Sequence, residues 1–333
     1  MTALLSVRDL RVALPTNRGA TEIVRGLSFD LNKGETLGIV GESGCGKSMT
    51  ALALMGLLPE GAETAGEVSY QGENLLRASE KRLCDLRGNR LAMIFQEPMT
   101  SLNPLHRIGD QVAEPLTLHA GLSRRQAKER AVELLDRVGI PDPRSRLDAY
   151  PHQLSGGQRQ RVMIAMALAC GPDILIADEP TTALDVTIQG QILDLIRQIV
   201  DDTGMALILI SHDLGVIAET VDRVLVMYAG RAVEAGPVHA VFSDLAHPYA
   251  RGLFAAMPRL DRALAERAYP RPPLPTIPGI VPDLHDLGPA CAFADRCSLS
   301  EPRCREKMPP EVFVSPEHWA ECWRTDEARR RLP

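Results

Sequence analysis

The chain of 333 residues has length for roughly two or three domains, and its 45% hydrophobic and 24% charged residues are typical of a folded globular protein, which excludes wholesale disorder. Its 37 Lys+Arg and 43 Asp+Glu give a formal net charge of -6, which argues against a protein that mainly coats nucleic acid. No apolar run reaches the roughly 18 to 20 residues that span a bilayer, and the N-terminus lacks the pattern of a secretion signal. We therefore expect a cytoplasmic chain that meets a membrane only through a partner.

The first 235 residues or so alternate short apolar runs with helical patterns. The apolar runs are typical of strands buried on both faces of a mainly parallel sheet; they cover residues 37–40, 91–95, 174–177, 207–210 and 224–227. Ser123 and Gln126 form a capping-box pattern before a helix that we expect to stop at Gly139, and Ile188 opens a further helical repeat. The fold class is therefore α/β.

One glycine-rich segment predicts a phosphate site. Residues 41–48 match G-x-x-x-x-G-K-[ST] between the strand at 37–40 and a helix expected to begin near Met49. Backbone N–H groups of such a loop face phosphate oxygens, Lys47 would hold the β- and γ-phosphates, and Ser48 would ligate Mg²⁺. The predicted nucleotide-binding residues are Gly41, Glu42, Ser43, Gly44, Cys45, Gly46, Lys47, Ser48 and Met49.

Two acids end the strand at 174–177. An acid at the carboxyl end of a strand beside a phosphate loop reaches Mg²⁺, which is the role we predict for Asp178. Glu179 would orient and polarise the attacking water.

Together with these motifs, the segment Leu154–Arg161, which reads LSGGQRQR, makes the chain resemble the ATP-binding subunits of ABC transporters. Gln96 matches the family's Q-loop glutamine, the segment 183–185 matches its D-loop, and His212 matches its switch histidine. The resemblance implies a P-loop ATPase core with a helical subdomain at about 97–165. It also implies catalytic roles for Glu179, His212 and Gln96, and a place for Gln96 among the Mg²⁺ ligands.

The resemblance further implies a head-to-tail dimer of two ATPase chains. The signature of one chain would close over ATP on the other, through Ser155, Gly156, Gly157 and Gln158. Residues 97–119 would sense the cytoplasmic helices of a permease. Family members usually stack adenine on an aromatic residue upstream of the phosphate loop; here residues 12–18 contain none, and we expect Leu14 to cover the base by apolar contact.

Four of the seven cysteines crowd near the C-terminus, which in a reducing cytosol suggests a metal site more readily than disulfides. Cys291, Cys297, Cys304 and Cys322 lack the paired C-x2-C spacing of a zinc ribbon. Four thiolates also hold a [4Fe–4S] cluster, so a cluster, zinc and unmetallated thiols all remain open from the spacing.

The segments at 247–253, 277–284, 291–297 and 318–322 are similar to those of dipeptide and oligopeptide importer ATPases. This resemblance implies an ATPase domain over residues 1–260 and, over 261–333, a proline-rich linker with an extension whose four cysteines bind a [4Fe–4S] cluster. It also implies a second ATPase chain (often a sister chain), two integral membrane permease subunits, a solute-binding protein and no nucleic acid, at the cytoplasmic face of the inner membrane.

The implied reaction is ATP hydrolysis that drives peptide import. Related importers carry nickel, opines or glutathione. An alternative function is that of a soluble ABC ATPase that acts on ribosomes or DNA. Such proteins usually carry two cassettes or a long inserted coiled coil, and the sequence shows neither.

Overall fold

The structure is a computed structural model that describes residues 3–96, 101–182, 184–257 and 275–331. Within these residues the larger sheet has the strand order β11-β12-β10-β9-β3-β8-β7-β6. Strands β9, β3, β8, β7 and β6 run parallel. The bounds of these five are Arg223–Tyr228, Thr36–Val40, Ala206–Ile210, Ile174–Asp178 and Leu91–Ile94. The predicted α/β class and the predicted strands are confirmed. Every residue of β3, β7 and β8 is buried, as expected for strands that are covered on both faces of the sheet.

A second, antiparallel sheet lies beside the first and was not predicted. Its order is β2-β1-β4-β5, with bounds Gly19–Leu31, Leu5–Thr16, Glu63–Tyr70 and Glu73–Asn74. The long strands β1 and β2 shift register three times along their pairing, which breaks the two-residue alternation that sequence patterns rely on.

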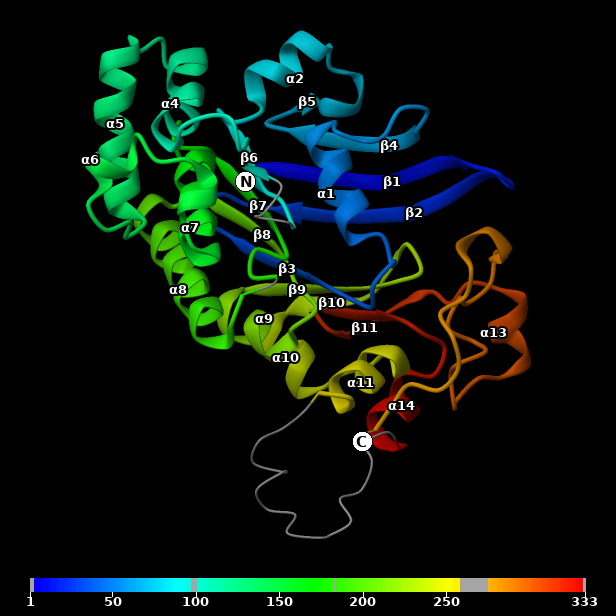
Figure 1. The fold of residues 1–333 in the computed structure, drawn as a ribbon. Coiled ribbons are helices and arrows are strands. Elements are labelled where there is room, and N and C mark those ends of the chain that lie inside the picture. Colours follow the sequence, from blue (N-terminus) through cyan, green and yellow to red (C-terminus); the bar gives the residue numbers. More distant parts are fainter. Residues whose placement is uncertain (1–2, 97–100, 183, 258–274, 332–333) are drawn as a thin grey trace, which may run out of the picture.

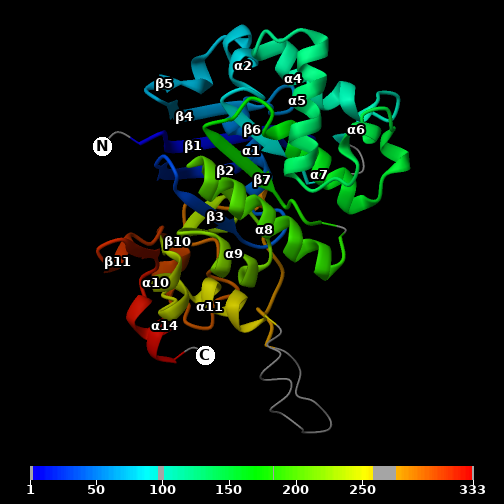
Figure 2. The same ribbon diagram turned by 90° about the vertical axis from the view of Figure 1, so that its left-hand side faces the viewer.

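Helices cover the parallel strands and form a projecting group. The group comprises α4 (Ile108–His119), α5 (Arg124–Arg137), α6 (Pro143–Arg146) and α7 (Gly156–Ala167), with the short turn η2 (Pro151–Gln153) between the last two. Figures 1 and 2 show it at the opposite end of the molecule from the C-terminal extension. The capping box before α5 is present, with Ser123 and Gln126 bonded to each other's backbone N–H, and the helix ends two residues before Gly139, which has a positive φ.

The remaining helices of the core connect its strands. They are α1 (Lys47–Met55), η1 (Leu75–Arg77), α2 (Glu80–Leu86), α8 (Val186–Thr203), α9 (Leu214–Thr220), α10 (Val238–Ser243) and α11 (Pro248–Ala255). Helix α8 is the one predicted from the repeat at Ile188, and its inner face carries the buried Ile192, Ile196 and Ile199. None of the helices in the described ranges is long and apolar enough to cross a membrane.

The extension completes the larger sheet. It comprises η3 (Leu284–Asp286), α13 (Pro302–Glu306), β11 (Glu311–Ser315), β12 (His318–Glu321) and α14 (Thr325–Arg331). Strand β12 pairs antiparallel with β10 (Arg231–Pro237), through Glu234 opposite Ala320. The extension is therefore built onto the core, and the predicted boundary at residue 260 falls outside the described residues.

Candidate functional site

The predicted phosphate loop connects β3 to α1. Helix α1 begins at Lys47, two residues earlier than expected, so Ser48 and Met49 lie in its first turn. Gly41 and Gly46 have φ of 155° and 101°, and a Cβ on them would lie 2.2 Å from the Met227 carbonyl oxygen and 2.8 Å from that of Ile23. Only glycine lets the loop pack this closely against the core.

Lys47 is the buried cation of this loop, with 6% of the residue exposed. Its Nζ donates hydrogen bonds to the carbonyl oxygens of Gly41 (2.8 Å) and Glu42 (3.1 Å). The Sγ of Cys45 lies 3.8 Å from the same Nζ, and burial raises the pKa of the Cys45 thiol. The lysine charge is thus held inside the loop, where phosphate oxygens would meet it.

Asp178 ends β7 beside this loop and is 3% exposed. Burial raises the pKa of its carboxyl group, and a hydrogen bond from Ser48 opposes that rise. The Oδ1 atom of Asp178 is buried and has no hydrogen-bond partner among the described residues. A buried oxygen with an unused lone pair next to the Ser48 hydroxyl is the donor set that Mg²⁺ prefers, so these two residues fit the predicted ion.

The three predicted catalytic residues converge on one carboxylate. Glu179 Oε2 accepts a hydrogen bond from Gln96 Nε2 (3.1 Å) and another from Thr182 Oγ1 (3.1 Å), and His212 Nδ1 lies 3.4 Å away. Glu179 has φ of 46°, a conformation that non-glycine residues rarely adopt. Such strain persists where the surrounding structure holds the residue in place, and it is common at functional sites.

The signature segment begins α7. Ser155 caps the helix: its Oγ accepts from the Gln158 N–H (3.3 Å), while its own N–H donates to Gln158 Oε1 (3.0 Å). A Cβ on Gly157 would lie 2.9 Å from a methyl of Ile188, and one on Gly156 would lie 3.6 Å from Leu184. The signature thus packs on the start of α8, next to the D-loop residues Leu184 and Asp185, whereas Ala183 lies outside the described residues.

Two residues that hold the phosphate loop were not predicted from the sequence. Tyr249 of α11 accepts a hydrogen bond from the Glu42 N–H at 2.8 Å, and Arg296 of the extension forms two hydrogen bonds with the Glu42 carboxylate. These bonds raise the pKa of Arg296. Because 254 residues separate Arg296 from Glu42, no local motif links them.

The extension also contacts the hairpin upstream of the loop. Arg18 forms ion pairs with Asp283 (3.0 Å) and Asp286 (2.7 Å), and His285 Nδ1 lies 3.3 Å from Thr21 Oγ1. Residues 12–18 contain no aromatic residue, as noted from the sequence, and the structure brings the imidazole ring of His285 to the side of this hairpin.

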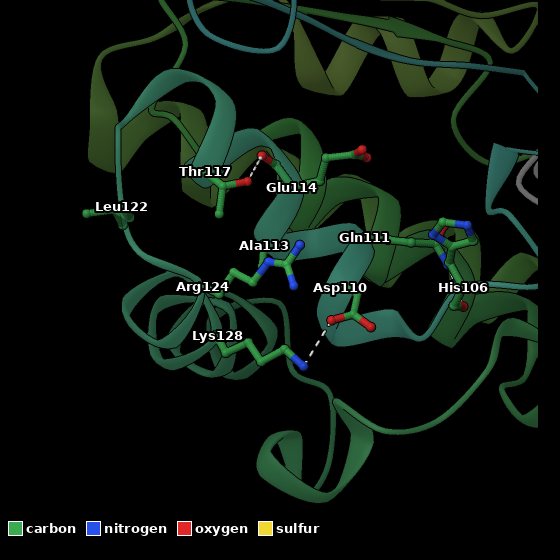
Figure 3. Close-up of a pocket in the computed structure, with 9 residues that line it drawn as sticks. All are labelled: His106, Asp110, Gln111, Ala113, Glu114, Thr117, Leu122, Arg124 and Lys128. Atoms are coloured by element: carbon green, nitrogen blue, oxygen red, sulfur yellow. Dashed lines mark hydrogen bonds and ion pairs between the residues drawn. The ribbon is translucent and has the colours of Figure 1, made fainter.

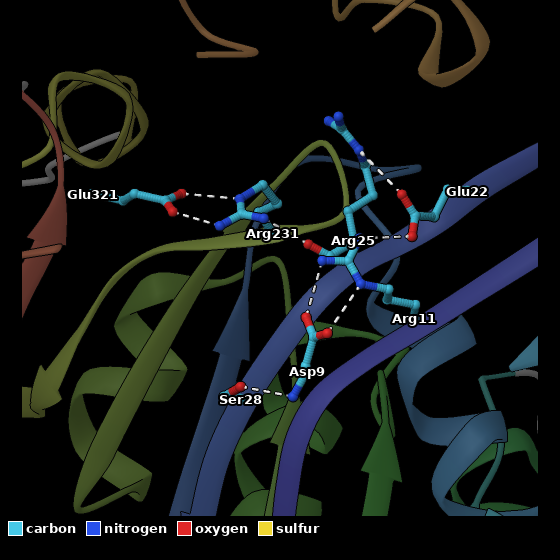
Figure 4. A network of polar contacts seen from close by, with 7 residues as sticks. All are labelled: Asp9, Arg11, Glu22, Arg25, Ser28, Arg231 and Glu321. Atoms are coloured by element: carbon cyan, nitrogen blue, oxygen red, sulfur yellow. Dashed lines mark hydrogen bonds and ion pairs between the residues drawn. The ribbon is translucent and has the colours of Figure 1, made fainter. Parts of the chain in front are cut away.

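A second polar network ties the extension to both sheets (Figure 4). Arg231 of β10 pairs with both oxygens of Glu321 (3.1 and 2.5 Å) and donates to the carbonyl oxygen of Arg25 in β2 (2.8 Å). Arg11 of β1 in turn pairs with Asp9 and Glu22. The residue after Glu321 is Cys322, so this network holds one end of the cysteine region.

The four C-terminal cysteines line one cavity, together with His247, Pro248, Phe293, Ala294, Leu299, Pro309, Trp323 and Arg324. Its free volume is about 10 Å³, and burial raises the pKa of Cys291 to about 11 and that of Cys322 to about 12. In the described part of the chain, no group of three or more His, Cys, Asp or Glu side chains is arranged to hold a metal ion. The cysteines suit a cluster by type and converge on one place, and the iron–sulfur site stays a prediction.

The helical group carries an open cleft of about 520 Å³ between α4 and α5 (Figure 3). An ion pair between Asp110 and Lys128 (2.9 Å) bridges the two helices there. Leu105 and Leu118, on the same segment, are 83% and 71% exposed. Of the segment predicted to sense a permease, residues 97–100 lie outside the described residues.

Comparison with known proteins agrees with these motifs. The ABC transporter family model matches residues 24–182, and the model for the oligopeptide/dipeptide transporter C-terminal region matches residues 233–304. The chain is 52% identical over 326 residues to "Probable peptide ABC transporter ATP-binding protein y4tR" of Sinorhizobium fredii, covering 97% of this chain and 96% of the relative. It is 49% identical over 329 residues to "Dipeptide transport ATP-binding protein DppD" of Bacillus subtilis, covering 98% and 96%.

Solved structures agree on the core. The dimeric ATP-binding cassette MJ0796 bound to ADP and Pi superposes with a TM-score of 0.63 at 26% identity, over 70% of this chain and 98% of that one. The structure of cbiO1 from Clostridium perfringens, part of the transporter complex cbiONQ, superposes with a TM-score of 0.61 at 26% identity, over 73% and 92%.

Proposed function

The chain belongs to the ABC transporter family and carries that family's oligopeptide/dipeptide C-terminal region, and from this premise we propose that it hydrolyses ATP to energise peptide import through a membrane permease. The observation that carries the proposal is the convergence of Gln96, Glu179 and His212 beside the phosphate loop. Relatives named for dipeptide and peptide transport support peptides as the solute.

The chemistry follows from the placement of charge. Lys47 and the N-terminus of α1 would stabilise the phosphates, since both present positive charge to an anion. Glu179 would take a proton from the attacking water, with Gln96 and His212 fixing its carboxylate. The bonds from Gln96 and Thr182 to Glu179 Oε2 support this role, because they hold the carboxylate in one position.

Ser48, Asp178 and Gln96 would hold Mg²⁺. Among their atoms, Oδ1 of Asp178 is the clearest ligand, because it is buried and no hydrogen bond to it is seen among the described residues. When bound, the ion neutralises charge on the β- and γ-phosphates.

A second ATPase chain completes the site in this proposal. Ser155, Gly156 and Gly157 begin a 12-residue helix whose free N–H groups suit the γ-phosphate of a facing chain. Val186, next to the D-loop, is 84% exposed and would be covered at the same interface. The dimeric state of the MJ0796 cassette supports this arrangement, with either an identical or a sister chain as partner.

The cleft between α4 and α5 is the proposed contact for one of the two permease subunits, and the second ATPase chain would contact the other. Exposed Leu105 and Leu118 offer apolar anchors, and the charged rim offers polar contacts. An extracytoplasmic solute-binding protein would deliver peptides to that permease, and the ATPase would lie at the cytoplasmic face of the inner membrane. Nucleic acid has no role in the proposal.

For the extension we propose a [4Fe–4S] cluster held by Cys291, Cys297, Cys304 and Cys322, in which the thiolates staple a short tail. The alternative with the same ligands is zinc. We expect anaerobically purified chain to be brown with about four irons per molecule. Colourless protein with one zinc per molecule would reject the cluster.

The proposed function is tested by purifying the tagged chain from its own membranes in mild detergent. We expect an integral membrane permease to copurify, and ATPase activity to rise when peptide-loaded solute-binding protein is added. Association with ribosomes or DNA in place of a permease would overturn the proposal.

A further inference from the structure

The phosphate loop contains one acidic residue, Glu42, and the C-terminal extension holds it. Arg296 Nη1 lies 2.7 Å from Glu42 Oε2, and Nη2 lies 3.0 Å from Oε1. The Arg296 side chain is 6% exposed and that of Glu42 is 26% exposed. A bidentate pair with this little solvent is geometrically specific and weakly screened, unlike a surface ion pair.

The orientation of Arg296 depends on the folded extension. Its Nε donates to the Pro278 carbonyl oxygen (3.0 Å), and its guanidinium carbon lies 5.8 Å and 5.9 Å from the ring centres of Tyr228 and Phe293. The next residue is Cys297, which lines the cysteine cavity. Unfolding of the cysteine region would therefore remove the Pro278 and Phe293 contacts that orient the guanidinium.

The other end of this contact reaches the nucleotide site. The Glu42 N–H donates to Tyr249, and its carbonyl oxygen accepts from Lys47 Nζ. Without Arg296, a free carboxylate would lie within the loop that receives the anionic phosphates, and it would repel them. The backbone that positions Lys47 would also lose one of its supports.

We propose that Arg296 is a positioning residue for nucleotide binding, which neutralises and holds Glu42 so that the folded cysteine extension sets the affinity of the phosphate loop for ATP. The inference rests on the proposed function only in that this loop binds ATP. By reciprocity, bound ATP stabilises the extension by the same factor by which the extension strengthens ATP binding.

The test is a double-mutant cycle on the full-length chain purified anaerobically, with the Kd for ATP measured by calorimetry. We expect Arg296→Gln to weaken ATP binding by about ten-fold, within the usual range of coupling between sites. The Kd of Glu42→Gln alone is the reference for the double variant. Adding Glu42→Gln to Arg296→Gln should restore most of the affinity that Arg296→Gln loses, because no carboxylate is then left to repel the phosphates. Arg305→Gln is the matched control, because Arg305 pairs only with the 89% exposed Asp295 and with Ser300 among the described contacts.

The rescue separates the proposal from a purely structural role. If Arg296→Gln weakens binding and Glu42→Gln does not restore it, Arg296 merely stabilises the fold and the proposal is wrong; unchanged affinity in Arg296→Gln overturns it as well. Should Arg296→Gln not fold, Arg296→Met, which removes the charge and keeps much of the apolar stem, takes its place in the same cycle. If the unmodified chain itself shows no ATP binding in the calorimeter, the proposed function is refuted instead.

Discussion

At the scale of single residues, we expect the proposed reaction to depend most on Glu179. Its carboxylate is contacted by Gln96, Thr182 and His212, and its backbone is held at positive φ. We predict that Glu179→Gln lowers the ATP turnover rate by at least about 100-fold, because the amide cannot accept the proton of the attacking water. The Kd for ATP should change little, since the phosphate loop is untouched; turnover near that of the unmodified chain would show that another group activates water.

Cys45 is a second residue-scale case. Its thiol is buried in the phosphate loop, and burial raises its pKa, whereas Cys84 is exposed. The thiolate is the reactive form, so we predict that iodoacetamide at pH 8 alkylates Cys84 well before Cys45. The difference between the two alkylation rates should become smaller as the pH rises toward the raised pKa of Cys45. Peptide mass spectrometry gives the order, and faster modification of Cys45 would contradict the burial argument.

At the scale of elements, β12 is fixed to β10 by a buried polar contact. His318 Nε2 lies 2.8 Å from Glu234 Oε1, and the carboxylate also accepts the N–H groups of Ala246 and His247. We predict that His318→Leu lowers the free energy of unfolding by roughly 1–3 kcal/mol, because a buried acceptor loses a partner. Thermal unfolding measures this loss of stability, and His239→Leu is the control because His239 is exposed. Equal melting temperatures for the two variants would refute the prediction.

The elements also show how far sequence reasoning reaches. The strands ending at Val40, Asp178 and Ile210 were predicted because burial on both faces leaves continuous apolar runs, and the capping box at Ser123 because it is local. Strands β1 and β2 were missed, since their register shifts blur the alternation. The pairing of β12 with β10 and of Arg296 with Glu42 joins residues that are distant in sequence, which no local pattern encodes. Gln96, Glu179 and His212 lie close together because each follows a parallel strand, and parallel strands end at the same edge of the sheet.

At the scale of the whole molecule, the extension contacts the core at several separate places. It adds strands to the larger sheet, pairs Glu321 with Arg231, and closes on the phosphate loop and the β1–β2 hairpin. We predict that Cys322→Ser abolishes bound metal and lowers the melting temperature, because one of four proposed ligands is lost. Metal analysis and thermal unfolding test this, with exposed Cys84→Ser as the control; full metal content in Cys322→Ser would exclude Cys322 as a ligand.

In the proposed mechanism ATP binds between two ATPase chains, which particle mass and crosslinking test together. The Glu179→Gln chain, extracted from membranes in detergent, is weighed by mass photometry with and without saturating Mg-ATP, and its ATPase chains are crosslinked and counted. We expect two ATPase chains in contact in each ATP-bound particle, with the crosslink between a phosphate loop and the facing signature. ATP-bound particles whose ATPase chains never contact one another would contradict it.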